Sequence, residues 1–252
     1  MIQVRRVLCC SDILMARADL FEHLPRLDAT TPQGTVAVTV VSHLRPTQNA
    51  VGMDEVNEKV ARIEKRSDAG LRAYLLERTI PVVIGDGGHP HLIDHHHLAR
   101  AVWLAEADTD VPVQVVRNWA PVTGLHFWKA LAEQHWMYPF AADGAGPIPV
   151  AQMCKHIRDL GNDIYRSLAW VARREYAYAK SADDPMFCEF QWAGFLRTHL
   201  VLKQLLGCTK DWTSVTLADL ERDDKDELTK VRRKLMYLAR SPEAHALPGY
   251  LG

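Results

Sequence analysis

The chain has 252 residues, of which 48% are hydrophobic and 24% are charged. This is the composition of an ordinary globular protein, so it argues against a disordered chain, and the length suffices for one large domain or two small ones. The formal net charge is -1, from 30 basic and 31 acidic residues. That balance disfavours a sequence-independent clamp on nucleic acid, because such proteins carry a strong basic field.

The cysteines and the apolar stretches indicate the compartment. The five cysteines lack paired CxxC spacing, so the sequence predicts neither a disulfide framework nor a structural zinc ribbon. Near the start of the chain, the apolar stretch is interrupted by Ser11 and Asp12 and is too short for a secretory signal. No later stretch approaches the roughly 20 apolar residues of a membrane span. We expect a cytoplasmic protein with no membrane partner.

The first half of the chain mixes strand and helix patterns. Runs rich in β-branched residues occupy residues 35–41, 80–84 and 111–116, and they predict strands. Between the first two runs, residues 54–66 and 71–78 place apolar side chains at helical spacing. This half therefore indicates an α/β or α+β arrangement.

The second half is mainly helical in pattern. The small-residue stretch 141–147 is the best boundary between the two regimes. We therefore predict an α+β protein with one domain over residues 30–143 and a helical region over residues 144–252. Helical patterns cover residues 150–160, 166–180, 186–206 and 217–240. The last of these contains many acidic and basic residues in alternation, which is more typical of a helix covering a neighbouring core than of a reactive site.

A carboxylate followed by three histidines stands out as the candidate site. Residues 80–84, the glycine-containing turn 85–88 and the short run 91–93 predict a hairpin that leads into a helix near Asp94 or His95. Asp94 is placed to cap that helix. Because helix N-termini favour anions and imidazoles titrate near neutrality, the segment predicts a phosphate or metal site.

Helix geometry favours phosphate over metal at this segment. Neighbouring positions on a helix diverge by about 100°, so at most two of the three histidines can point the same way. A metal would need His95 with Asp94, or a ligand from elsewhere such as His89, His91 or His126. The metal, if any, stays unknown at this point.

Two further segments contain candidate residues. After the first strand, Arg45, Thr47 and Gln48 offer a guanidinium, a hydroxyl and an amide, which suit either a phosphate or carboxylate ligand or an ordinary turn. Later, aromatic residues recur at helical spacing over 190–195, a pattern more typical of core packing. Glu189 and Arg197, the charged residues in this stripe, are the members that merit testing.

The segment D-G-G-x-P-x-L-I-D-H-H-H-L-A-R-A, after its strand, resembles the ParB/sulfiredoxin superfamily, in which a motif of the type I-D-G-H-H-R lies at a nucleotide or phosphate site. The chain is similar, more narrowly, to the ParB-like nuclease family. That resemblance covers about residues 36–197, and its matching segments are 44–48, 51–52, 94–97, 127–128, 166–169 and 190–197. It implies a ParB/sulfiredoxin-like N-terminal domain.

The resemblance implies an activity and assigns residues to it. Asp94, His96 and His97 match the motif and are the expected catalytic residues, whereas the motif's Gly is His95 and its Arg is Leu98. The expected reaction is phosphodiester hydrolysis or nucleotide-dependent phosphoryl transfer, with Mg²⁺ or Mn²⁺ and ATP or another nucleotide as cofactors. Residues expected to bind the ligand or its phosphate are Arg45, Thr47, Gln48, His95 and Arg100.

An alternative is a nucleotide- or metabolite-binding module that uses the same pocket without turnover. The departures at His95 and Leu98 favour it, since the lost arginine removes a phosphate fork. Sulfiredoxin activity is not expected, because no cysteine lies between Cys10 and Cys154. In either case the expected partner is a nucleotide or another small molecule, and nucleic acid is not favoured by the net charge.

Overall fold

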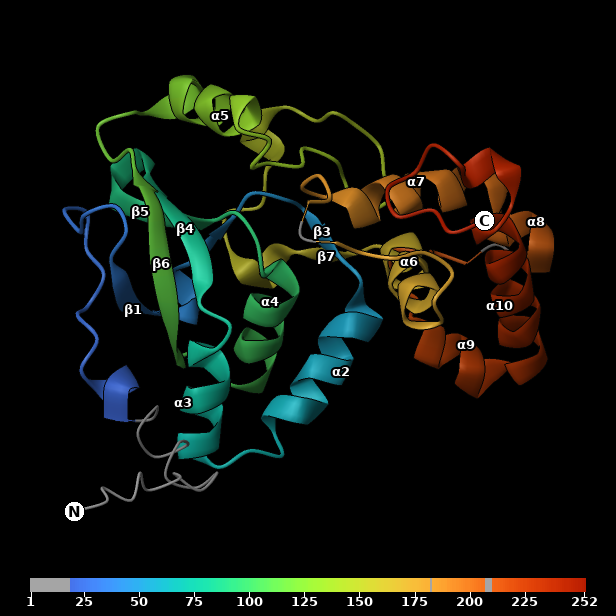
Figure 1. Cartoon of the computed structure of the whole chain (residues 1–252), viewed down its shortest axis with the longest axis horizontal. Helices are drawn as coiled ribbons and strands as arrows, with labels where there is room; N and C mark the ends of the chain where they lie inside the picture. Colours follow the sequence, from blue (N-terminus) through green and yellow to red (C-terminus); the bar gives the residue numbers. More distant parts are fainter. Residues whose placement is uncertain (1–18, 182, 207–209) are drawn as a thin grey trace, which may run out of the picture. The chain divides into compact units, whose positions relative to one another are not determined.

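The computed structural model describes residues 19–181, 183–206 and 210–252 (Figure 1). The chain forms two compact units whose segments alternate along the sequence. Of the described residues, unit 1 comprises 19–46, Val60–Phe127 and His156–Arg158, and unit 2 comprises those within Thr47–Lys59, Trp128–Lys155 and Asp159–Gly252. The boundary that the sequence suggests between residues 143 and 144 falls inside a segment of unit 2.

Unit 1 is built on a mixed five-stranded sheet in the order β1-β6-β4-β5-β2. Pairing is antiparallel for β1 with β6 and for β4 with β5, and parallel for β6 with β4 and for β5 with β2. The three predicted strands are confirmed as β1, β4 and β6. Their β-branched side chains favour the extended conformation. The bounds are β1 Val36–Val40, β2 Arg45–Pro46, β4 Ile80–Gly85, β5 His89–Leu92 and β6 Asp110–Asn118.

The helices of the first half begin close to where their patterns predict. Helix α2 spans Met53–Ile63 and α3 spans Asp68–Leu76, with the Ser67 hydroxyl accepting a hydrogen bond from the N–H of Gly70. Such a cap satisfies one of the N–H groups that a helix start leaves without a partner. Helix α4 spans His96–Ala105 and packs on the 3₁₀ helix η1 (Val41–His43), and α5 spans Gly124–Glu133. The fold class, α+β, is as expected.

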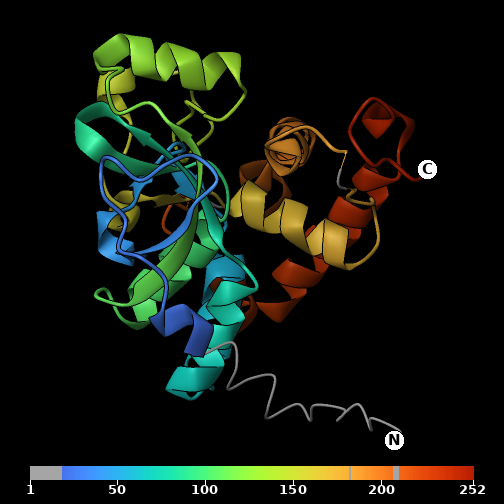
Figure 2. The same ribbon diagram turned by 60° about the vertical axis from the view of Figure 1, so that its left-hand side comes forward.

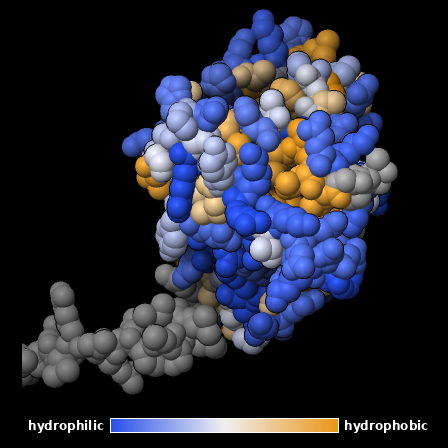
Figure 3. Space-filling model, turned by 90° about the vertical axis from the view of Figure 1, so that its right-hand side faces the viewer, coloured by the Kyte–Doolittle hydropathy of each residue, from blue (hydrophilic) through white to orange (hydrophobic). Residues whose placement is uncertain are grey.

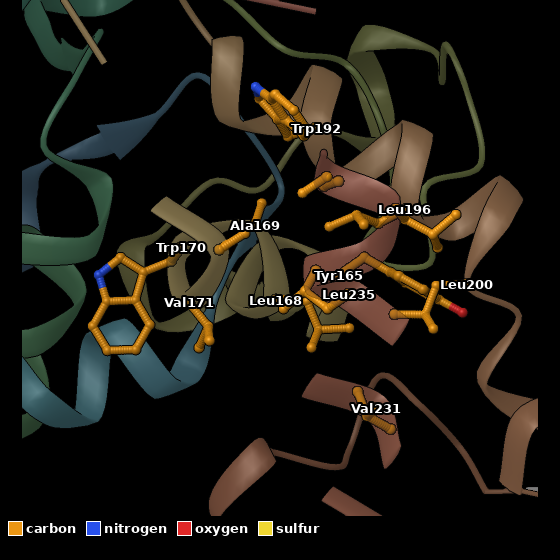
Figure 4. Packing of buried hydrophobic residues seen from close by; sticks show 14 of the residues in the cluster. Tyr165, Leu168, Ala169, Trp170, Val171, Trp192, Leu196, Leu200, Val231 and Leu235 are labelled. Carbon is orange, nitrogen blue, oxygen red and sulfur yellow. The ribbon is translucent and has the colours of Figure 1, made fainter. Parts of the chain in front are cut away.

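Unit 2 is mainly helical and has its own core. Its helices are α6 Ile164–Arg174, α7 Cys188–His199, α8 Leu202–Leu206, α9 Leu217–Asp223 and α10 Lys225–Ala239, and the short strands β3 Ala50–Val51 and β7 Gly161–Asn162 pair in parallel. Helices α6 and α10 lie against each other (Figure 2). Trp192, Leu196, Leu168 and Leu235 meet in the core (Figure 4). The charged segment 217–240 thus covers a core, as predicted.

Several helix bounds differ from the sequence patterns. The predicted helix at 150–160 is wrong: this stretch forms two 3₁₀ helices, Val150–Gln152 and Ile157–Asp159. Side chains from distant segments bind its backbone instead, since Asn49 Oδ1 accepts from the N–H of Cys154 at 2.7 Å and Arg100 Nη1 donates to the carbonyl of Ile157 at 3.1 Å. These bonds compete with an α-helical ladder.

Breaks also divide the last two predicted helices. Residues 186–206 form α7 and α8, and residues 217–240 form α9 and α10 with Asp224 between them in an extended conformation. The Asp224 carboxylate accepts from the N–H groups of Asp226 and Glu227 and so starts a new helix.

Within the described residues, no helix has both the length and the apolar character needed to cross a bilayer. The sequence argument about the first apolar stretch concerns residues that lie outside the described part of the chain. In the view of Figure 3, hydrophilic side chains surround an apolar area on this face of the molecule.

Candidate functional site

The hairpin that leads into the candidate motif is present as predicted. Strands β4 and β5 pair antiparallel, with Gly85 opposite His89. Gly87 and Gly88 take positive φ angles of 70° and 76°, which glycine adopts without steric cost. A Cβ on Gly85 would lie 2.2 Å from a ring carbon of Phe127, so the hairpin and the start of α5 approach too closely for any other residue. The hairpin is therefore held in one position by packing.

The turn into α4 depends on the conformation of His95. This residue has φ 64° and ψ 23°, in the left-handed region, and it precedes the first helical residue, His96. The family motif has glycine at this position, which is the residue that adopts left-handed angles most readily. His95 keeps the same turn, and its Nδ1 lies 3.1 Å from the carbonyl oxygen of Arg78. The departure from the motif therefore leaves the backbone geometry in place.

Asp94 does not cap the helix in the way the sequence predicted. The N-cap is His95, and no side chain caps α4. Asp94 is exposed and lies one residue earlier, where its Oδ1 accepts a hydrogen bond from the N–H of His95 at 2.6 Å. The left-handed turn accounts for the difference, because it directs the carboxylate to the cap residue instead of to the first turn of the helix.

The three histidines diverge, as consecutive positions must. His96 is only 3% exposed, and burial, together with the neighbouring His97 and His95, lowers its pKa well below the usual value. It is therefore a neutral imidazole in the interior. His97 is half-buried, and Leu98, which stands where the motif has Arg, is buried. Of the two histidines that match the motif, His97 is thus the more accessible.

Arg100 lies on another side of α4. Its Nη1 donates to the carbonyl oxygen of Ile157, and its guanidinium lies over the ring of Trp103 at 4.9 Å from the ring centroid. These contacts give Arg100 a part in holding the 3₁₀ helix Ile157–Asp159. Its expected role as a phosphate ligand stays a prediction.

The three candidates between residues 45 and 48 fall in different surroundings. Arg45 belongs to β2 of unit 1, pairs with His91 of β5 and is half-buried. Thr47 and Gln48 belong to unit 2 and are buried, and Gln48 Nε2 donates to the carbonyl of Ala50 at 2.6 Å. The three candidate ligand residues are therefore divided between the two units, and the amide of Gln48 hydrogen-bonds to the backbone two residues further on.

A cavity of about 370 Å³ in unit 1 contains residues that the sequence did not connect. Arg45 lines it together with Ser42, His43, His89 and His156. From the sequence, His89 was expected only as a metal ligand from outside the motif, and no pattern pointed to His43 or His156. No spacing signal could have found this group, because His89 and His156 are far along the chain from residues 42–45 and only the folded structure brings them together.

The charged residues of the aromatic stripe form ion pairs inside unit 2. The carboxylate of Glu189 pairs with Arg166 and Arg173, and the Nζ of Lys180 lies 3.7 Å from it. Burial alone would raise the pKa of Glu189, but the charges of Arg166 and Lys180 lower it below its usual value. Arg166 also contacts Glu55 at 3.2 Å. The sequence named Glu189 but missed Arg166, which is its central partner.

Arg197 has a comparable structural partner. Its Nη2 donates to Asp163 Oδ2 at 2.6 Å, and Asp163 Oδ1 accepts from the N–H groups of Tyr165 and Arg166 at the start of α6. Burial raises the pKa of Asp163, and the charge of Arg197 opposes that rise. Arg197 therefore stabilises the ionised form of a helix cap.

The metal-binding side chains of the described residues are dispersed. Among the residues that the structure describes, no group of three or more His, Cys, Asp or Glu side chains is arranged to hold a metal ion. A Mg²⁺ or Mn²⁺ ion would thus have to share protein ligands with water and a phosphate ligand, as Mg²⁺ commonly does. Asp94 is the exposed carboxylate of the motif that such an ion could use.

Comparisons with known proteins agree with the motif. The family described as "Putative ParB-like nuclease" matches residues 37–198. The crystal structure of protein Atu1540 from Agrobacterium tumefaciens is similar, with 31% sequence identity and a TM-score of 0.68 over 86% of this chain and 98% of that chain. No curated protein matches the sequence. The chain belongs to the ParB-like nuclease family.

Proposed function

We propose that the chain acts on a phosphate-bearing small molecule at the Asp94–His97 segment, by phosphodiester hydrolysis or nucleotide-dependent phosphoryl transfer. The observation that carries this proposal is the left-handed His95, which starts α4 at His96 and leaves His97 half-buried in its first turn. The positive end of the helix dipole favours a phosphate there. Family membership supports the same chemistry.

The geometry suggests different roles for the three motif residues. His97 is the candidate general base or phosphate ligand, because an imidazole near neutral pH can hold or release a proton. Asp94 Oδ1 binds the N–H of His95, and Oδ2 has no partner among the described residues, so it could bind a divalent ion. His96, which is buried and neutral, supports the turn from the interior.

The partner that we propose is a nucleotide or another small molecule in the cytoplasm. The net charge of -1 does not favour the long phosphate backbone of nucleic acid. A bound Mg²⁺ or Mn²⁺ would supply positive charge to the phosphate, which the motif here lacks because its Arg is replaced by Leu98.

A thermal-shift panel tests this proposal. The whole chain is measured with ATP, CTP, GTP and ADP, each with and without Mg²⁺ or Mn²⁺, and compared with His97→Ala. We expect at least one nucleotide to raise the melting temperature of the wild type by more than that of the variant, since a ligand stabilises the folded state in proportion to how tightly it binds. His96→Ala is unsuitable, because it would open a cavity in the interior.

His245→Ala is the matched control, because His245 is exposed and lies in unit 2, far along the chain from the motif. It should respond to ligands as the wild type does. An equal shift in His97→Ala and the wild type, or no shift with any nucleotide or metal, would contradict the proposal.

A second candidate is a binding module without turnover. It is favoured by the burial of Leu98, which is 4% exposed and cannot replace the phosphate fork of the motif's arginine. This alternative predicts saturable nucleotide binding with no product. Release of inorganic phosphate, or of a nucleotide product, in proportion to wild-type protein and abolished in Asp94→Asn would exclude it.

A further inference from the structure

The cavity around Arg45 is the strongest feature of unit 1 that the motif does not use. It has a volume of about 370 Å³, within the size range of small-molecule sites, and neither Asp94 nor the three following histidines line it. We propose that it is a second binding site, specific for a small molecule that carries a phosphate group. This proposal does not depend on the function assigned to the motif.

Arg45 is the first reason. Its guanidinium is half-buried at the cavity wall and makes no hydrogen bond or ion pair with the residues that the structure describes. Loss of water lowers the pKa of Arg45, and the charge of Asp86 opposes this effect. A permanently charged group that has lost part of its hydration without gaining a direct partner favours an anion beside it.

The nearby carboxylates do not serve as that partner. Asp28 also lines the cavity, but its Oδ1 accepts hydrogen bonds from the N–H and hydroxyl of Thr30, both at 2.8 Å. These bonds, and those from Thr31, lower the pKa of Asp28 and keep it ionised. Asp86 Oδ2 accepts from the N–H of Gly124 at 3.1 Å. Both carboxylates therefore stabilise loops, and neither contacts the guanidinium.

The other polar side chains of the cavity are hydrogen-bond donors. Ser42 and the buried Thr39 contribute hydroxyls. His89 contributes an imidazole whose pKa is lowered by desolvation and by Arg45, so it is neutral near pH 7 and offers one N–H. His43 and His156 add two more imidazoles. In the described part of the chain these rings do not form a three-ligand metal group.

This donor set fits a phosphate better than a carboxylate. Arginine forms two parallel hydrogen bonds with either anion. A carboxylate then has little acceptor capacity left, whereas a phosphate has further oxygens for hydroxyl and imidazole donors. A phosphate dianion also carries twice the charge to pair with Arg45. The geometry therefore points to a phosphate monoester or inorganic phosphate.

Isothermal titration calorimetry on the whole chain tests the proposal, with inorganic phosphate and acetate as probes at constant ionic strength. We expect saturable binding of phosphate, weaker binding of acetate, and about a tenfold or greater loss of phosphate affinity in Arg45→Gln, as removal of a charge-assisted fork implies. His89→Gln should weaken phosphate binding less. If Arg45→Gln does not fold, the phosphate affinity of His89→Gln still tests the proposal.

Two controls separate this site from the others. Arg72→Gln removes an exposed arginine of the same unit that pairs with Glu22, and it should bind phosphate as the wild type does. His97→Ala should also retain phosphate binding, whatever becomes of the proposed function at the motif. Unchanged affinity in both Arg45→Gln and His89→Gln, tighter binding of acetate than of phosphate, loss of binding in His97→Ala, or no saturable binding of phosphate would overturn the proposal.

Discussion

The two units differ in whether their buried or half-buried arginines have carboxylate partners. In unit 2, Arg166 is buried between Glu55 and Glu189, and Arg197 pairs with Asp163, so each interior charge has an opposite charge in contact with it. In unit 1, Arg45 has no such partner among the residues that the structure describes. The ion pairs of unit 2 show that a charged residue embedded in a motif can stabilise the fold, whereas the lack of such a partner at Arg45 is the reason for proposing a ligand there.

The largest expected effect concerns the buried charges of unit 2. The charge of the buried Arg166 is balanced by Glu55 and Glu189, which both contact its Nη2, whereas its Nη1 has no hydrogen-bond partner in the described structure. Arg166→Leu would leave these two buried carboxylates without their main partner. We expect the free energy of unfolding to fall by about 3–5 kcal/mol. Urea unfolding measures this change.

A double-mutant cycle sharpens that result. Because Arg166 and Glu189 are in contact, Arg166→Leu combined with Glu189→Leu should cost less than the sum of the two single substitutions. A loss below about 1 kcal/mol in Arg166→Leu would mean that unit 2 does not depend on this ion-pair group.

The second effect is the pH dependence of unit 1. Burial lowers the pKa of His91 from 6.5 to about 4. Between these values the unfolded chain binds a proton that the folded chain excludes, so stability is complete above pH 6.5 and decreases as the pH falls towards 4. The shift corresponds to about 3 kcal/mol. His96, whose pKa burial also lowers, acts in the same direction.

Unfolding free energies measured from pH 7 to pH 4 check this prediction. Carboxylates contribute their own pH dependence, so the informative quantity is the difference between wild type and His91→Gln. The variant should lose less stability over this range, because glutamine does not titrate. Parallel curves for the two proteins would show that His91 does not remain neutral in the fold.

A third test concerns the packing that holds the hairpin of unit 1. Gly85→Ala places a methyl group 2.2 Å from the ring of Phe127, which requires a shift of β4 or of the ring. Overpacking of this kind costs about 1–3 kcal/mol. The readout is the free energy of unfolding, together with phosphate binding at the Arg45 cavity.

The glycine of α7 in unit 2 is the matched control. A Cβ on Gly194 meets nothing within 4 Å, so Gly194→Ala should stabilise the protein by up to about 1 kcal/mol through helix propensity. If Gly85→Ala proved as harmless as Gly194→Ala, close packing would not be what positions the hairpin.

The smallest effect is expected for an exposed ion pair of unit 2. Arg174 pairs with Glu58, and its side chain is 52% exposed. Arg174→Gln should therefore cost about 1 kcal/mol or less, and added salt should reduce the difference from wild type. A cost equal to that of Arg166→Leu would remove burial as the explanation of the unit 2 ion pairs.

Much of the fold was predictable because its signals are local. The three long strands, the glycine turn before the motif and the start of α4 follow from β-branched runs, turn residues and helical spacing. The failure at residues 150–160 has a non-local cause, since Asn49 and Arg100 bind that backbone from elsewhere in the chain. No window of sequence around residue 155 contains that information.

For the candidate site, the sequence by itself determined the family and the divergence of three consecutive histidines, because motif and helix geometry are properties of a short segment. Only the tertiary structure decided that His96 faces the interior and that Arg45 shares a cavity with His89. Burial and proximity depend on how strands and helices pack. Residues such as Arg45 and His89, which are distant in sequence, become neighbours when β2 pairs with β5.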